Sequence, residues 1–103
     1  MTFILVLQWP AVSEADYDLL LSMEDRLEAE FDEAYGYVDG HDFGSGEMNI
    51  FVHTDSPIDA FRNAESALGG VPGWATVRAA YRPADGDDYT VVWPANLQEF
   101  SVS

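Results

Sequence analysis

The chain contains no cysteine and no lysine. Without cysteine it has no disulfides, thiolate zinc sites, iron–sulfur clusters or cysteine nucleophile. Its strongly basic side chains are four arginines, against 19 acidic residues, and the formal net charge is −15. Binding to nucleic acids and to anionic membranes relies on lysine and arginine. The composition therefore predicts no nucleic-acid partner and no membrane partner, and it favours basic proteins or cations.

Long apolar runs are also missing. The run at residues 3–7 is far shorter than the ~20 residues of a membrane-spanning helix, and no cleavage pattern of a signal peptide follows it. We interpret it as a buried strand of a cytoplasmic protein. The composition is that of a folding chain, with 48% hydrophobic and 14% aromatic residues in 103 positions. This length predicts a single domain, residues 1–103, with its own core.

The N-terminal part of the chain predicts a strand followed by a helix. Residues 2–9 are apolar on both faces, which is typical of a central strand. A helix is expected from Ser13 to about Phe31, with Ser13 and Asp16 as its capping box. The acidic residues of this helix, Glu24 among them, fall outside its apolar stripe. The predicted buried stripe consists of Tyr17, Leu20, Met23, Leu27 and Phe31.

The rest of the chain predicts a hairpin, a second helix and two more strands. The hairpin arms are expected at residues 35–41 and 47–53, with residues 44–46 as the turn. Ser56 is the expected N-cap of the second helix, with Pro57 in its first turn and Asp59 completing a capping box. The final strands are expected at residues 74–82 and 89–93. The buried stripe of the second helix is predicted to be Ile58, Phe61, Ala64 and Leu68.

This order of elements predicts an α+β fold. Two β-α-β units around a hairpin are typical of the ferredoxin-like β-α-β-β-α-β two-layer sandwich, here with an extra C-terminal strand. Right-handed crossovers place both helices on one face of an antiparallel sheet, with the first and third strands at its centre. The opposite face would then be an open surface, which favours a ligand or a homodimer formed through that face.

The most unusual segment is the hairpin tip. Three interpretations compete: a structural turn, which glycines and polar caps favour; a divalent-cation site; and a recognition loop. The cation ligands would be Asp39, His41, Asp42 and Glu47, with His53 or Asp55 in addition, and would suit Mn²⁺ or Mg²⁺. The candidate residues of the tip are Asp39, His41, Asp42, Ser45, Glu47 and Asn49.

The same segment holds the residue types of a catalytic triad. Ser45, His41 and either Asp39 or Asp42 could meet there, but a hairpin tip holds catalytic geometry poorly, and Ser45 fits a turn residue better. The sequence contains no cofactor-binding motif, and we predict no cofactor. Enzymatic activity is left open, with a non-enzymatic function favoured.

A resemblance adds one expectation. The run DGHDFGSGEMNIF at residues 39–51, followed by residues 54–57, resembles a hairpin signature of short uncharacterised bacterial proteins. Residues 81–82 and 93–94 are weaker echoes of the same group. The resemblance implies a bacterial origin and carries no known biochemistry.

The charge pattern supplies the leading functional hypothesis. The chain is similar to immunity proteins, which mask basic toxin nucleases, in its size, its acidity and its acidic first helix. We expect a binding module that engages a basic protein partner, with an immunity-type inhibitor as the most specific form. The alternatives are a small metal-dependent enzyme and a dimeric ligand-binding protein, both centred on residues 39–49. The predicted partner-binding residues are Asp18, Asp25, Glu28 and Asp32.

Overall fold

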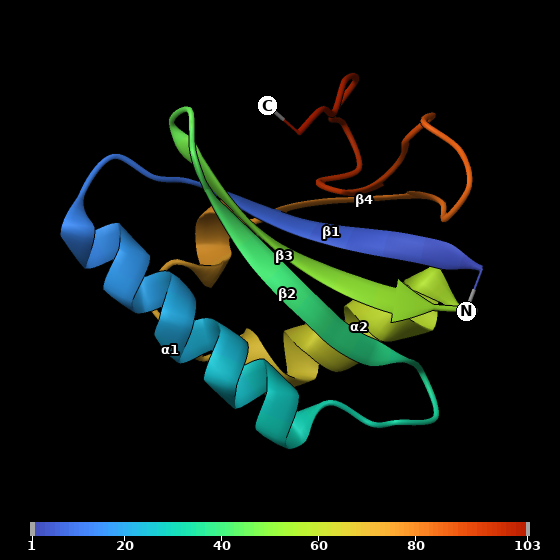
Figure 1. The fold of residues 1–103 in the computed structure, drawn as a ribbon, viewed down its shortest axis with the longest axis horizontal. Coiled ribbons are helices and arrows are strands. Elements are labelled where there is room, and N and C mark those ends of the chain that lie inside the picture. Colours follow the sequence, from blue (N-terminus) through green and yellow to red (C-terminus); the bar gives the residue numbers. More distant parts are fainter. Residues whose placement is uncertain (1, 103) are drawn as a thin grey trace.

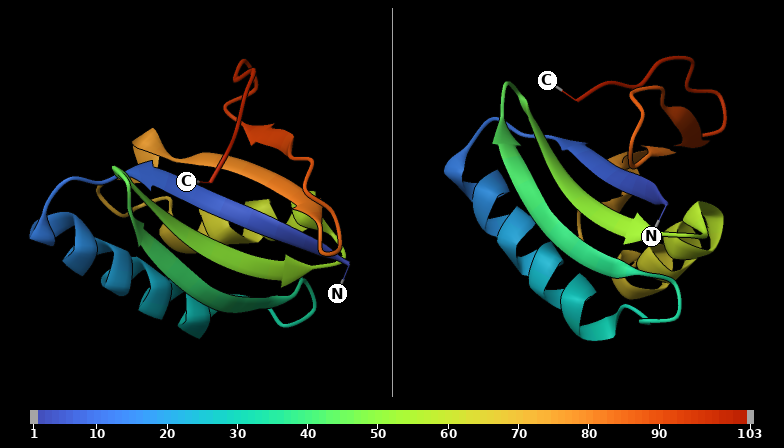
Figure 2. Two further views of the ribbon diagram at one scale, coloured as in Figure 1. Left: turned by 45° about the horizontal axis from the view of Figure 1, so that its top comes forward. Right: turned by 45° about the vertical axis from the view of Figure 1, so that its right-hand side comes forward.

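The computed structural model describes residues 2–102 as an antiparallel sheet with helices on one face. The sheet order is β2-β3-β1-β4-β5, and each neighbouring pair is antiparallel. Both α-helices cover one face, and the segment after β5 returns across the other (Figures 1 and 2). In chain order the elements are β1 (Phe3–Pro10), α1 (Glu14–Glu30), β2 (Tyr37–Gly44), β3 (Glu47–Thr54), α2 (Pro57–Leu68), the 3₁₀ helix η1 (Trp74–Thr76), β4 (Arg78–Pro83) and β5 (Thr90–Trp93).

Strand β1 lies at the centre of the sheet, which confirms its predicted position. Its side chains alternate between the two faces. Leu5, Leu7 and Trp9 belong to the core beneath the helices. Val6 and Gln8 point to the other face and are also fully buried, because strands and the C-terminal segment surround them. The two-sided burial explains why the run is apolar on both faces.

Helix α1 begins as the sequence predicts. The Ser13 side chain accepts the Asp16 N–H, and Asp16 bonds back to the Ser13 N–H, so the capping box is present. Two side chains differ from the expectation. Tyr17 is 38% exposed, and Glu24 is buried. Leu20, Met23 and Leu27 form the buried stripe as predicted.

The β2–β3 hairpin is longer and less regular than its residue pattern suggests. Ser45 and Gly46 form the turn with φ angles of 56° and 80°, the signs required by a type I′ hairpin turn. Strand β2 begins at Tyr37, two residues later than expected, and continues to Gly44. Its register shifts between Val38 and Gly40, which leaves Asp39 as an extra residue in a bulge.

Two predictions about α2 are wrong. The Ser56 side chain makes no capping hydrogen bond, so the expected box with Asp59 is absent; instead the Ser56 N–H donates to Thr54 Oγ1 at 2.9 Å. Ile58 is 45% exposed, because the buried stripe runs along a neighbouring set of positions. That stripe consists of Ala60, Phe61, Ala64, Ala67 and Leu68.

The last two strands are shorter than predicted. Gly73 adopts a φ of 101° and opens η1, so the chain turns once before β4 begins at Arg78. Strand β5 begins at Thr90 and ends at Trp93. Residues 94–102 then cross the face of the sheet that the helices leave uncovered (Figure 2), with the carbonyl of Ser101 bonded to Gln8. We call this uncovered side the open face.

Candidate functional site

The predicted hairpin residues do not converge on one point. The bulge at Asp39 reverses the side-chain alternation of β2, because an added residue shifts every later side chain to the opposite face. His41 therefore pairs opposite the core residue Ile50 and faces the helices. Asp42 pairs opposite Asn49 on the open face. Ser45 occupies the turn itself.

His41 forms a pair with a carboxylate that sequence reasoning placed outside the core. Its Nδ1 lies 2.9 Å and 3.0 Å from the two carboxylate oxygens of Glu24. Since a carboxylate only accepts hydrogen bonds, Nδ1 carries the proton. The Glu24 side chain is 12% exposed and that of His41 is 30% exposed. The Tyr17 ring lies edge-on to both His41 and Phe43, so the pair fastens the hairpin to α1.

Asp39 has a different histidine as its partner. Its Oδ2 lies 3.1 Å from His53 Nε2, and the Tyr37 ring stacks on the His53 ring at 5.1 Å between centroids. Asp55 Oδ1 accepts the backbone N–H of Thr2 at 2.9 Å and its hydroxyl at 3.1 Å. These bonds, the backbone one foremost, hold the pKa of Asp55 below its ordinary value.

The candidate cation ligands are thus distributed over three places. His41 faces the helices, Asp39 belongs to the His53 pair, and Asp42 and Glu47 lie on the open face. Within residues 2–102, no group of three or more histidine or acidic side chains has the arrangement of a metal site. The histidines serve as links between elements in this arrangement.

A network of polar side chains lies on the open face. Gln8 and Asn49 are both 0% exposed. The Gln8 amide nitrogen lies 3.0 Å from Asn49 Oδ1 and from Glu47 Oε2 and 2.9 Å from the Ser101 carbonyl oxygen, so these three acceptors share its two N–H groups. Arg78 donates through Nη2 to the Gln8 side-chain oxygen. Of these residues, the sequence pattern indicates Glu47 and Asn49 but not Gln8 and Arg78, the two that bond to each other at the centre of the network.

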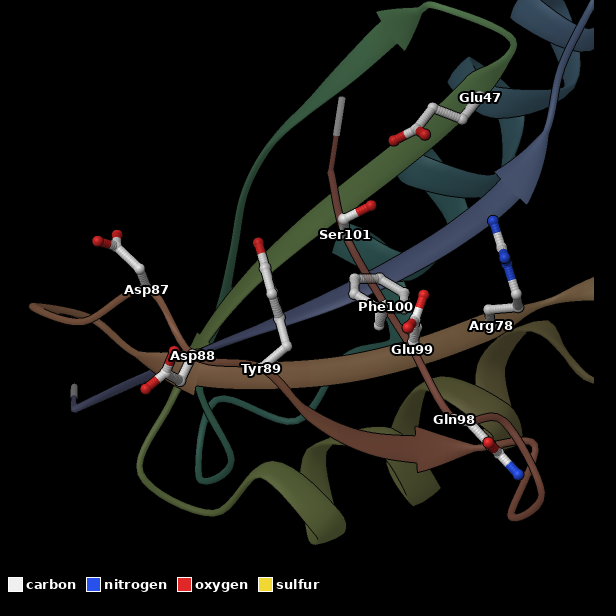
Figure 3. A pocket seen from close by; sticks show the side chains of 9 residues that line it. All are labelled: Glu47, Arg78, Asp87, Asp88, Tyr89, Gln98, Glu99, Phe100 and Ser101. Carbon is white, nitrogen blue, oxygen red and sulfur yellow. The ribbon is translucent and has the colours of Figure 1, made fainter.

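A cavity of about 600 Å³ opens beside this network. Figure 3 shows its lining, which comes from β3, β4, the loop before β5 and the C-terminal segment. Glu47 is the one hairpin candidate that reaches it. Because the C-terminal segment lies over the open face, a homodimer formed through that face would have to accommodate or displace this segment.

The acidic surface of α1 is a second candidate. Asp18 and Asp25 are seven residues apart, so they share the solvent side of the helix, with Glu28 beside them. All three are exposed. We call these three residues the α1 acidic stripe. Asp32, predicted as a fourth member, lies beyond the helix, and its Oδ1 accepts the Ala34 N–H at 2.9 Å.

Comparisons with known proteins return no match among protein-family models, curated protein sequences or solved structures. The site must therefore be interpreted from its own geometry and charge. None of the helices described between residues 2 and 102 is long and apolar enough to cross a membrane.

Proposed function

We propose that the protein is a binding module whose α1 acidic stripe engages a basic protein partner. An inhibitor of the immunity type, masking a basic surface on a toxin nuclease, is the most specific form of this proposal. The proposal rests on the solvent side of α1, along which Asp18, Asp25 and Glu28 are exposed.

The contacts that the arginines make within the fold support this proposal. Arg26 forms an ion pair with Glu30 and donates to the Ala67 carbonyl. Arg78 bonds to Gln8 in the open-face network. Arg82 donates to the backbone carbonyl of Pro83 at the end of β4 and to those of Ala84 and Gly86 in the loop that follows. Three of the four arginines thus bond to groups other than the carboxylates of the α1 acidic stripe. In a chain of net charge −15, the stripe therefore presents its negative charge to a partner.

The charges at the C-terminal end of α1 are also opposite to those that the helix dipole favours. Its last turn contains acidic residues and no basic residue, although the helix dipole favours cations at that end. A basic partner would supply the missing positive charge. Complementary charge across the interface would raise the association rate and make binding sensitive to salt.

Affinity capture from the source cells at low and high salt tests the proposal. We expect a basic protein that binds at low salt and dissociates at high salt. The variant Asp18→Asn, Asp25→Asn, Glu28→Gln should weaken binding of that purified protein by about tenfold or more, which corresponds to ~1.4 kcal/mol. Isothermal titration with the purified pair at several ionic strengths provides the measurement.

The matched control changes the same number of exposed charges elsewhere. The variant Asp59→Asn, Glu65→Gln, Asp85→Asn neutralises acidic residues of α2 and the β4–β5 loop, which are exposed and lie outside α1. It should retain most of the affinity. Equal losses for both triple variants would show that net charge alone attracts the partner, and an unaffected stripe variant would refute the assignment to α1.

Two further parts of the proposal concern the fold and the location. We propose that the fold is the ferredoxin-like plan with β5 added at one edge. The order β2-β3-β1-β4 and the placement of both α-helices on one face support this relation. We also propose a cytoplasmic location in a bacterium, which the lack of cysteine and the hairpin signature at residues 39–51 support.

A further inference from the structure

The cavity beside the open-face network has the size of a small-molecule site. Its volume of about 600 Å³ lies within the range of about 300–1,000 Å³ that such sites occupy. Figure 3 shows Glu47 on β3 and Arg78 on β4, the two strands that flank β1, with Tyr89 and Phe100 between them and the loop. Helix α1, which carries the acidic stripe, lies on the opposite face of the sheet from the C-terminal segment (Figure 2).

Arg78 is held in place from the sheet. Its Nη2 donates to the side-chain oxygen of Gln8, which is fully buried and bonded in turn to Asn49 and Ser101. A guanidinium has five N–H groups in a planar fork. Gln8 takes one of them, so the fork is oriented and keeps donors for a carboxylate bound in a bidentate manner.

The remaining charges define what else the ligand must carry. Glu47, Asp87, Asp88 and Glu99 line the same cavity. A simple anion would meet Arg78 but would be repelled by four carboxylates. A ligand with its own positive charges would be attracted by them. The rings of Tyr89 and Phe100, whose centroids are 5.0 Å apart, add aromatic faces that favour a cation.

We propose that this cavity binds a free basic amino acid, a small molecule with one carboxylate, two cationic groups and a net positive charge. Its α-carboxylate binds Arg78, and its side-chain cation lies among the carboxylates of the loop and the C-terminal segment, Glu99 among them. This site is separate from the surface proposed for the protein partner and does not depend on it.

A ligand series on the wild-type protein tests the charge argument directly. L-arginine and L-lysine should bind and raise the melting temperature. Agmatine, which lacks the carboxylate, and L-glutamate, which lacks the side-chain cation, should bind about tenfold more weakly or worse. Titration calorimetry gives the affinities, and amide chemical shifts of Tyr89, Phe100 and Ser101 locate the site. Agmatine binding as tightly as L-arginine would overturn the role given to Arg78.

Two variants separate the ends of the ligand. Arg78→Gln should reduce L-arginine binding to the level of agmatine and should not weaken agmatine, which has no carboxylate for Arg78 to bind. Glu99→Gln, at an exposed position, should weaken both. Asp18→Asn removes the same charge from α1 and should weaken neither. If Arg78→Gln fails to fold, the ligand series and Glu99→Gln still test whether the cavity binds a basic amino acid. No binding of either basic amino acid, or equal losses in Glu99→Gln and Asp18→Asn, would refute the proposal.

Discussion

The pair formed by Glu24 and His41 is the least expected contact at the scale of single residues. A buried carboxylate is stable only where hydrogen bonds replace water. Replacing His41 by alanine would leave Glu24, 12% exposed, without its imidazole. We expect a loss of about 2 kcal/mol in the free energy of unfolding at neutral pH, since a buried polar group without a partner costs about 1–3 kcal/mol. Urea unfolding followed by circular dichroism measures it.

The second partner of the pair provides the control. Glu24→Gln keeps a side-chain oxygen that can accept the His41 N–H and removes the buried charge, so it should cost less than His41→Ala. The double variant His41→Ala, Glu24→Gln should be more stable than His41→Ala alone, because the buried charge is gone. A double variant as unstable as the sum of the two single variants would contradict a direct interaction.

The capping carboxylate of Asp16 leads to a prediction about how stability depends on pH. Its carboxylate accepts the backbone N–H of Val12 at 2.8 Å and that of Ser13 at 3.2 Å. These bonds, that from Val12 foremost, lower the pKa of Asp16 below its ordinary value. The stabilisation is therefore complete above the pKa of an unfolded aspartate, about 4, and is lost as the pH falls through the lower pKa of the folded state.

The measurement compares wild type with Asp16→Ala from pH 7 downwards. The wild type should be more stable at neutral pH, and the difference should shrink below about pH 4. Asp18→Ala on the same helix matches the change in charge but does not remove the cap. A difference between wild type and Asp16→Ala that grows as the pH falls would contradict the assigned sign.

At the scale of elements, the bulge in β2 explains both what the sequence predicts and what it misses. Glycines, polar residues and alternating apolar residues identify the hairpin, and the core face of β3 follows from its period of two. Asp39 looks like any other polar strand residue, and the one local signal is the glycine after it, Gly40 with a φ of 144°, because a glycine inside a strand often marks a bulge. That insertion nevertheless directs His41 towards α1 and Asp42 to the open face. The predicted cation ligands therefore lie on opposite faces of the sheet and do not form one cluster.

Gly36, just before β2, allows a close approach that no other residue permits. It is buried with a φ of 139°, and a Cβ built there would lie 1.9 Å from the backbone oxygen of His53. We expect Gly36→Ala to cost about 3 kcal/mol or more, because backbone atoms would have to move and the conformation is strained for alanine. Thermal unfolding measures it.

Gly70 after α2 is the matched site for this comparison. A Cβ there would meet nothing within 4 Å, so Gly70→Ala should change stability by less than about 1 kcal/mol. Similar losses in the two variants would mean that the contact between Gly36 and His53 does not limit the packing of β2 on β3.

At the scale of the whole molecule, the C-terminal segment decides how much of the site a sequence can predict. The pattern of apolar residues is enough to place β1 in the centre and the α-helices on one face. The return of residues 94–102 across the open face depends on contacts between residues distant in the chain, such as Gln8 and Ser101. Gln8 is the one available signal, because an amide inside a central apolar strand needs buried partners. Its neighbour Arg78 has no such mark, since an arginine at the first position of a strand is ordinary.

The net charge of −15 leads to a prediction for the whole chain. Three of the arginines already make contacts within the fold, so added salt has few favourable ion pairs to weaken and many repulsions to screen. We expect the melting temperature to rise by about 5 °C between about 10 mM and about 0.5 M sodium chloride. This corresponds to about 1 kcal/mol for a domain of this size.

The stripe variant of α1 links this salt effect to particular residues. Asp18, Asp25 and Glu28 lie on one side of a single helix, where they repel one another, and the acidic last turn also opposes the helix dipole. Neutralising them should raise the melting temperature at low salt and reduce its dependence on salt. A wild type that loses stability as salt is added would show that pairs such as Arg26 with Glu30 outweigh the repulsion. The acidic surface would then be stabilised internally, and a basic partner would gain less from neutralising it.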